Sequence, residues 1–302
     1  MFASSKRISP RGRTVVVTGA SSGLGRACAL HLDRLGFQVF AGVRRTSDAE
    51  ELAVASQSGA LYPLMLDVTC EDSIGTAAEV VADAVDGKGL WGLVNNAGIC
   101  VSAPLECVTP AQMRWQLETN LVGHLAVTQA LLPQLRAARG RIVNVSSGLG
   151  RISSPFLGAY ASSQFAKEGL SDALRRELKP TGVDVAVIQP GAINTPIWGK
   201  VSQVGQDVLS ASSRDIADLY REPFLRFLEM NENRALTSST RPENFSKAVT
   251  RALTAVRPRT RYSVGSDARA TNLLARMLPD AVLDAGFDVV SRGRAKRVPS
   301  VG

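Results

Sequence analysis

Short apolar runs recur along this chain, and longer helical patterns separate them. The runs are rich in Val, Leu and Ile and do not alternate with polar residues, which is typical of strands buried on both faces. Such strands form a parallel sheet that helices cover on both sides. Six runs lie at residues 14–19, 37–43, 61–67, 90–98, 141–147 and 183–191, and a shorter one lies at 262–265. The rhythm predicts an α/β fold with a doubly wound parallel sheet of six to seven strands and helices on both faces.

The helical patterns near residues 70–86, 110–139 and 159–179 are long enough to serve as crossovers in a parallel sheet. The rhythm breaks after the sixth run. Residues 192–240 are longer and more polar than a simple crossover, and they contain an amphipathic segment at 216–230. Excursions of this length beyond a strand are usually functional loops or lids. We expect a lid over a substrate, and a variable surface insertion is the alternative.

The composition suits one large domain. The chain has 302 residues, of which 45% are hydrophobic and 21% charged, as is ordinary for a globular protein. The net charge of +8 is concentrated at the two ends, residues 1–13 and 257–302, while the segment between them is close to neutral. We therefore expect no nucleic-acid partner, and peripheral contact of the basic tails with anionic membranes stays an alternative.

Cysteine and histidine do not predict a metal site. The four cysteines lack CxxC spacing, and only His31 and His124 could supply imidazoles. We expect His124 to pack within a helix. Scattered cysteines fit a reducing compartment, and no apolar run approaches the ~18–20 residues that span a bilayer. With no apolar leader before the first strand, these features predict a cytoplasmic protein.

A glycine-rich turn joins the first predicted strand to the first predicted helix, with the spacing G-x-x-x-G-x-G. Glycine lets a backbone turn tightly and approach a pyrophosphate, whose charge the N-terminal N–H groups of the helix stabilise. The strand–turn–helix context supports this interpretation, and a tight turn without a ligand is the alternative. The residues expected to hold the phosphates of a dinucleotide are Gly19, Ser21, Ser22, Gly23, Leu24 and Gly25.

Several further motifs occur in a specific order. TGASSGLG at 18–25 is followed by NNAG at 95–98, by Ser147 and Tyr160 thirteen residues apart, and by PG at 190–191. Together they resemble the short-chain dehydrogenase/reductase family over about residues 13–265. The runs GFQVFAG and GLWGLVNNAG resemble its hydroxysteroid, retinol and 3-hydroxybutyrate dehydrogenase branch.

The resemblance implies one Rossmann domain over residues 13–265, of which 192–240 form the lid. A basic tail, residues 1–12, would precede the domain, and a helical extension with a basic tail, residues 266–302, would follow it. The activity implied is NAD(P)-dependent hydride transfer between an alcohol and a carbonyl.

The end of the second strand bears on the choice of nicotinamide. An acidic residue there would bind the ribose 2′-hydroxyl and repel a 2′-phosphate, whereas arginine pairs with that phosphate. Here the position is Val43, followed by Arg44 and Arg45. We therefore predict NADP(H) rather than NAD(H), and two solvated surface arginines are the alternative. The resemblance assigns further cofactor contacts to Asp67, Val68, Asn95, Ala97, Gly98, Tyr160, Gln164, Pro190, Gly191, Ile193 and Thr195.

Reduction of a carbonyl needs a nearby acid, and the reverse reaction needs a base. Tyr160 is the candidate, although a free phenol has a pKa near ~10 and ionises at neutral pH only in favourable surroundings. Ser147 can orient the substrate oxygen. Asn120 matches the family's helix asparagine, which supports a proton-relay water.

The chain departs from the family at the position four residues after the tyrosine. The family has a lysine there, which binds the nicotinamide ribose and lowers the pKa of the tyrosine by its charge. Here the residue is Gln164, which can form hydrogen bonds but carries no charge. We therefore predict largely intact cofactor binding and a weakened acid/base. Lys167 lies about 10 Å from Tyr160 along the helix. We expect it to be solvated, with replacement of the missing lysine as the alternative.

The substrate is expected to enter beside Tyr160 under the lid. An apolar lining could come from Ile197, Trp198, Phe224, Phe227 and Met230, although these residues could equally pack the lid. The branch resemblance implies a lipophilic alcohol or ketone, such as a steroid or retinoid, and a homo-oligomer formed through the helices at 110–139 and 159–179. The alternative function is a cofactor-binding sensor or scaffold with little catalysis.

Overall fold

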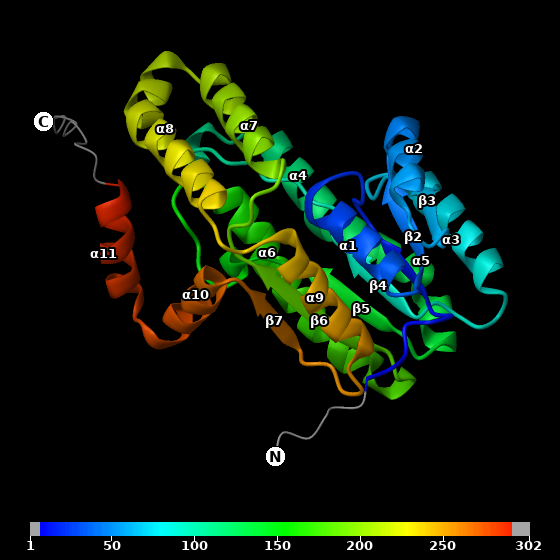
Figure 1. Cartoon of the computed structure of the whole chain (residues 1–302). Coiled ribbons are helices and arrows are strands. Elements are labelled where there is room, and N and C mark those ends of the chain that lie inside the picture. Colours follow the sequence, from blue (N-terminus) through cyan, green and yellow to red (C-terminus); the bar gives the residue numbers. More distant parts are fainter. Residues whose placement is uncertain (1–6, 292–302) are drawn as a thin grey trace, which may run out of the picture.

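The computed structural model describes residues 7–291, which contain a seven-stranded sheet with parallel neighbours throughout (Figure 1). The strands are β1 (Thr14–Val17), β2 (Gln38–Val43), β3 (Leu61–Met65), β4 (Gly92–Asn95), β5 (Arg141–Val145), β6 (Asp184–Pro190) and β7 (Arg261–Val264). Their order is β3-β2-β1-β4-β5-β6-β7. The chain winds from β1 to one edge and then from β4 to the other, so the predicted doubly wound sheet is confirmed.

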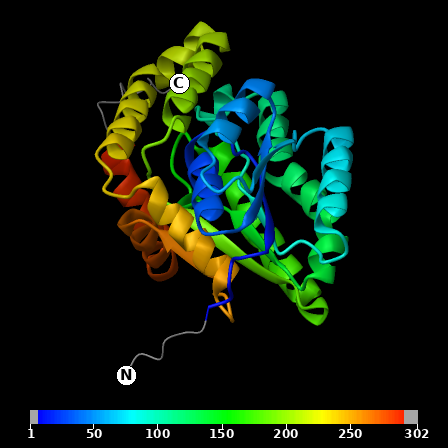
Figure 2. The ribbon, with the colours of Figure 1, turned by 45° about the vertical axis from the view of Figure 1, so that its right-hand side comes forward.

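Strand β1 explains the continuous apolar runs. Val15 and Val17 enter the core on one face of the sheet, Val16 enters the core on the other, and all three are fully buried. The first core includes α1 (Gly23–Arg34) and α9 (Pro242–Thr254), which pack side by side. The second includes α3 (Glu71–Val85), α5 (Gly123–Ala137) and the end of α6 (Gly158–Leu178). Figure 2 shows these helices on opposite sides of the sheet.

Three helical features were not predicted. The helix α2 (Thr46–Ala55) lies between β2 and β3, and α9 covers the first core with Phe245 and Leu253 fully buried. The pattern at 110–139 is not one regular helix. It divides into α4 (Pro110–Leu117), a π-helical turn at Glu118–Val122, and α5.

The predicted lid segment forms a helical hairpin, α7 (Ile197–Ala211) and α8 (Arg214–Leu236), beyond the carboxyl ends of the strands (Figure 1). Phe224 and Phe227 are buried in a separate apolar cluster, where their rings lie 5.4 and 5.2 Å from that of Phe156. Ile197 and Met230, by contrast, are 38% and 45% exposed. The two phenylalanines therefore pack the hairpin together.

Both described ends of the chain pack onto the domain. The Ile8 amide donates to the Thr254 carbonyl at 2.7 Å, and the Arg13 guanidinium lies over the ring of Trp91. The two apolar-faced helices predicted after β7 are α10 (Ser266–Met277) and α11 (Asp280–Ser291). The disordered tail expected from residue 292 onward lies outside the described residues. Within residues 7–291, no helix has the length and hydropathy needed to cross a membrane.

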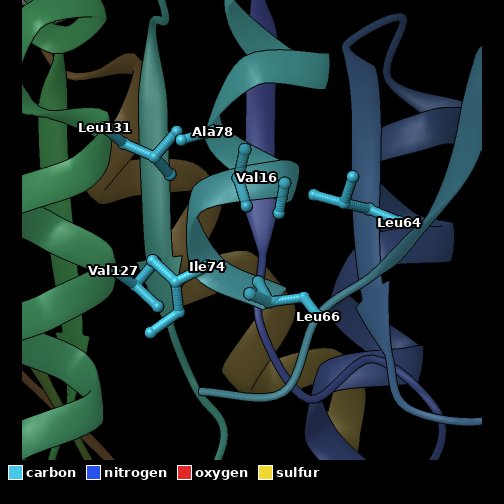
Figure 3. A pocket seen from close by; sticks show the side chains of 8 residues that line it. Val16, Leu64, Leu66, Ile74, Ala78, Val127 and Leu131 are labelled. Carbon is cyan, nitrogen blue, oxygen red and sulfur yellow. The ribbon is translucent and has the colours of Figure 1, made fainter. Parts of the chain in front are cut away.

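A small cavity in the second core is a packing gap. It lies between the sheet, α3 and α5, and Figure 3 shows apolar side chains around it, among them Val16, Ile74 and Leu131. Its volume of about 10 Å³ leaves room for no more than a water-sized molecule, and its apolar walls offer a water no partner.

Replacing Phe245 by alanine tests the contribution of α9. Phe245 is fully buried, so Phe245→Ala removes its packing and leaves a cavity, and we expect the free energy of unfolding to fall by about 3–5 kcal/mol. Urea denaturation measures this change. The matched control is Phe165→Ala on α6, where the ring is 46% exposed and the expected loss is under about 1 kcal/mol. Equal losses in the two variants would contradict this account of the core.

Candidate functional site

The glycine-rich turn leaves β1 and enters α1 with two residues in the left-handed region. Gly19 has φ +65° and Gly23 has φ +54°, conformations that side-chain-bearing residues rarely adopt. A β-carbon on Gly25 would clash with the Gly19 carbonyl, so the helix can start this close to the strand only without a side chain there. Ser22 is the N-cap residue, and its side chain makes no capping hydrogen bond. The turn therefore has the shape that a pyrophosphate needs, with the helix N-terminus facing it.

The NNAG segment after β4 holds this turn in place. The Asn96 side-chain amide donates to the carbonyls of Thr18 and Gly19, at 3.0 and 3.2 Å. The Thr18 hydroxyl accepts from the backbone amides of Asn96 and Ala97, both at 2.9 Å. The sequence did not single out Thr18 or Asn96, because only their tertiary hydrogen bonds reveal the role. Asn95 is fully buried and donates to Thr128 and Asn144, and so it supports the sheet.

The end of β2 carries the predicted cofactor selectivity. Val43 is buried, and the Arg45 guanidinium makes two hydrogen bonds to Asp48, at 2.8 and 2.9 Å. Arg44 is exposed and has no ion pair within the described residues. Of the two arginines, Arg44 is therefore the one whose guanidinium is available to an anionic ligand.

The adenine-contacting pair proposed after β3 is held by local packing. The Asp67 carboxylate accepts from the backbone amide and the hydroxyl of Thr69, at 3.0 and 2.8 Å. Val68 is buried, and its carbonyl lies so close to Gly123 that a side chain there would not fit.

Ser147 and Tyr160 come close to each other across β5 and α6. Ser147 follows β5, Tyr160 lies in the first turn of α6, and the Ser147 hydroxyl is near enough to the phenol to favour its ionised form. Burial raises the pKa of the Tyr160 phenol well above its usual value, the nearby Cys100 raises it further, and the Ser147 hydrogen bond opposes the rise. An ionised Tyr160 therefore needs a positive charge in its surroundings.

Asn120 lies in the π-helical turn. Its side chain accepts from the Ile99 amide and donates to the Ile99 carbonyl, both at 2.9 Å, and it also lies 3.4 Å from the Ser163 hydroxyl. The Ser163 hydroxyl in turn donates to the Tyr160 carbonyl. Asn120 therefore connects the NNAG segment to the start of α6. Irregular π turns of this kind occur often at functional sites.

Gln164 points into the protein interior. Its side chain is 2% exposed, and its Oε1 has no hydrogen-bond partner among the described residues. A buried amide oxygen without a partner is costly, and a bound ribose hydroxyl is the kind of group that would satisfy it. Together with the glycine-rich turn, this unpartnered oxygen fits a nicotinamide dinucleotide. The residues placed to hold its nicotinamide ribose are Gln164 and Tyr160.

The expectation of a solvated Lys167 is wrong. Lys167 is 2% exposed, and its ammonium group donates to the Val145 carbonyl at 3.0 Å. Helix periodicity explains the difference, because residues 164, 167 and 171 lie on one face of α6 and that face packs on the sheet. Burial lowers the pKa of Lys167 to about 7, although Glu168 opposes this shift.

His124 has the packing role predicted for it. The ring is 2% exposed and its Nε2 contacts the Ala97 carbonyl. Burial and the neighbouring Lys167 hold the pKa of His124 well below its usual value, so the imidazole is neutral at pH 7.

The loop after β6 is fixed from two sides. The Asp267 carboxylate, at the start of α10, accepts from the Ala192 amide at 2.7 Å and packs so tightly on Gly191 that a β-carbon there would clash. The Ser238 hydroxyl donates to the Ala192 carbonyl at 2.6 Å. Neither Asp267 nor Ser238 was predicted. For Asp267, the sequence signal is a short polar residue at the start of the helix that follows the seventh strand.

The predicted residues beyond this loop reach the cofactor turn. Ile193 is buried, and its carbonyl accepts from the Trp198 indole at 2.8 Å. The Thr195 side chain lies against Gly23, where a β-carbon would be 3.5 Å away. The segment after Pro190 thus spans from the sheet to the glycine-rich turn, as a nicotinamide-contacting segment must.

Comparisons with known proteins agree with this geometry. A family model described as short chain dehydrogenase matches residues 13–205. The 3-amino-tetrahydro-pyrrolizinone reductase of Xenorhabdus hominickii is 42% identical over 279 residues, covering 92% of this chain and 96% of the relative. Retinol dehydrogenase 16 of Homo sapiens is 39% identical over 290 residues, covering 95% and 91%.

A solved structure shows the same architecture. A short-chain dehydrogenase from Streptomyces avermitilis superposes with a TM-score of 0.73 at 28% identity, covering 93% of this chain and 98% of the other. Motifs, fold and relatives agree, and the chain belongs to the short-chain dehydrogenase/reductase family.

Proposed function

We propose that this protein is an NADP(H)-dependent oxidoreductase that interconverts an alcohol and a carbonyl on a lipophilic substrate. The observation that carries the proposal is the approach of Ser147 to the Tyr160 phenol, together with the buried, unpartnered Gln164 oxygen one turn later on α6. One site thereby contains an acid/base group in Tyr160, a hydrogen-bond donor in Ser147, and in Gln164 an unpartnered acceptor for the cofactor.

Each residue has a defined task in the proposed reaction. The Ser147 hydroxyl donates to the substrate oxygen, and Tyr160 gives a proton to that oxygen during reduction or removes it during oxidation. The dinucleotide, when bound, supplies or accepts the hydride. Gln164 binds the ribose without contributing a charge, and this supports a lower rate than a lysine at 164 would give.

The substrate class rests on relatives and on the lid. One relative is named for retinol, a largely apolar alcohol, and another for an amino-substituted pyrrolizinone, which is smaller and more polar. The lid contributes an apolar cluster next to the site, and this cluster includes Cys100 and Leu149. A steroid-like or retinoid-like alcohol or ketone fits these features, and a screen of such compounds in both directions tests the choice.

A second function deserves a direct test because of Gln164. Without a charge at 164, the chain could bind the cofactor and act as a sensor or scaffold with little catalysis. We propose a homo-oligomer and a cytoplasmic location for either function. Tight NADPH binding without turnover above background would favour the second function.

Tyr160→Phe tests the catalytic assignment. Removing the phenolic hydroxyl removes the proton donor, so we expect turnover to fall by about 10²- to 10⁴-fold, while loss of one ribose hydrogen bond raises the dissociation constant for NADPH by no more than about tenfold. Steady-state kinetics and NADPH fluorescence measure the two quantities. Tyr62→Phe, on the exposed part of β3, is the matched control and should leave both unchanged. Full activity in Tyr160→Phe would refute the assignment.

Arg44→Ala tests the cofactor preference. Losing a charged hydrogen bond to the 2′-phosphate should weaken NADPH binding about tenfold or more and leave NADH binding nearly unchanged. Arg45→Ala is the control, because that guanidinium already pairs with Asp48, and we expect a smaller effect. An equal loss for both nucleotides in Arg44→Ala would contradict a 2′-phosphate contact.

A further inference from the structure

Lys167 occupies a defined level in the contact between α6 and β5. Ser171 accepts a hydrogen bond from Asn144, Lys167 donates to the Val145 carbonyl, and Tyr160 lies near Ser147. The helix therefore runs back along the strand, and successive turns contact successive strand residues. Val145 precedes Ser147 by two residues, which is about 7 Å along a strand. The Lys167 ammonium thus lies one level below the catalytic pair.

The charge of Lys167 is not neutralised by a carboxylate within the described residues. The neighbouring Glu168 is committed elsewhere, because its oxygens accept from Gln189, Arg151 and Arg261 at 2.8, 3.2 and 2.8 Å. The other titratable group facing Lys167 is His124 of α5, which is neutral. Among the elements packed around it, β5 offers only the Val145 carbonyl.

Two buried polar atoms on α6 and α5 also lack partners among the described residues, Gln164 Oε1 and His124 Nδ1. An ammonium has three donors, and only one of those of Lys167 is used by the protein. A buried cation with spare donors is expensive for a purely structural residue. The arrangement is better explained by a ligand or a charge that appears nearby during function.

We propose that Lys167 supplies the positive charge of the catalytic site, stabilising the ionised form of Tyr160 from one helical turn below Gln164. The inference rests on the proposed function. Lys167 touches neither cofactor nor substrate and acts through Tyr160, so it is a positioning residue. In this chain the two tasks needed beside the tyrosine are divided, with hydrogen bonding at residue 164 and charge at residue 167.

The sign of the pH effect follows from this division. Lys167 favours the Tyr160 phenolate only while it is protonated, and the phenolate in turn raises the pKa of Lys167 above the value of about 7 that burial gives it. Inside a protein, one unit charge at about 7–10 Å shifts a neighbouring pKa by about one to two units. The two groups titrate as a coupled pair, so the measured midpoint belongs to the pair.

Lys167→Met is the decisive variant because methionine keeps an unbranched chain and removes the charge. Ultraviolet titration of the tyrosinate band, as a difference between the chain and its Tyr160→Phe variant, isolates Tyr160 without requiring turnover. We expect Lys167→Met to raise the Tyr160 midpoint by at least about one pH unit. Where turnover is measurable, the midpoint of the oxidation rate should rise in parallel, with little change in the NADPH dissociation constant.

Two further variants separate charge from structure. Lys167→Gln retains a donor for the Val145 carbonyl and should raise the Tyr160 midpoint as Lys167→Met does. Ser171→Ala removes a buried hydrogen bond on the same face of α6 and retains the charge. It should lower the melting temperature without moving the midpoint. An unchanged midpoint in both Lys167 variants would overturn the proposal. Absence of turnover in the unaltered chain would overturn the proposed function instead.

Moving the charge provides an independent test. The double variant Gln164→Lys/Lys167→Val places the ammonium one turn nearer to Tyr160 and refills the buried position with an apolar side chain. We expect its Tyr160 midpoint to be at or below that of the unaltered chain and its turnover to be at least as high. A midpoint as high as that of Lys167→Met would show that charge on this face of α6 does not reach Tyr160.

Discussion

The parallel arrangement of the sheet is the constraint on which the site depends. Because all seven strands run the same way, their carboxyl ends meet at one edge, and most of the predicted cofactor segments follow one of those ends. The winding direction changes between β1 and β4, where the glycine-rich turn and the NNAG segment face each other. The hydrogen bonds of Thr18 and Asn96 join these two segments. The cofactor cradle is thus a direct product of the topology.

The confirmed predictions rest on patterns of neighbouring residues. The features that were missed or wrongly predicted depend on contacts between residues far apart in the sequence. The strands and the glycine-rich turn are each defined by a short run of consecutive residues, so the sequence alone locates them. The π turn at Asn120 has no such signature, because it depends on hydrogen bonds to Ile99 across the site. Helix α9 does carry a local signal that was not predicted as a helix, because Phe245, Val249 and Leu253 recur every four residues after a proline.

Lys167 shows the same limit in a single residue. Its spacing from Tyr160 is compatible with either an exposed or a buried face, and lysine is rarely buried, so the sequence favoured exposure. The decisive facts are tertiary: the face that carries Gln164 and Ser171 packs on β5, and the Val145 carbonyl accepts the ammonium. A residue type that usually lies on the surface is here part of the interior.

The C-terminal extension belongs to the site for a comparable reason. Asp267 holds the Ala192 amide and lies 3.4 Å from the Arg234 guanidinium at the end of α8, so one carboxylate joins the nicotinamide loop, the lid and α10. The Ser238 hydroxyl adds a second contact from the end of the lid to the same loop. The loop carries no charged side chain of its own between Pro190 and Thr195. Its position is therefore set from outside, by residues that follow it by more than forty positions in the sequence. These contacts link the position of the loop to that of α8 and α10.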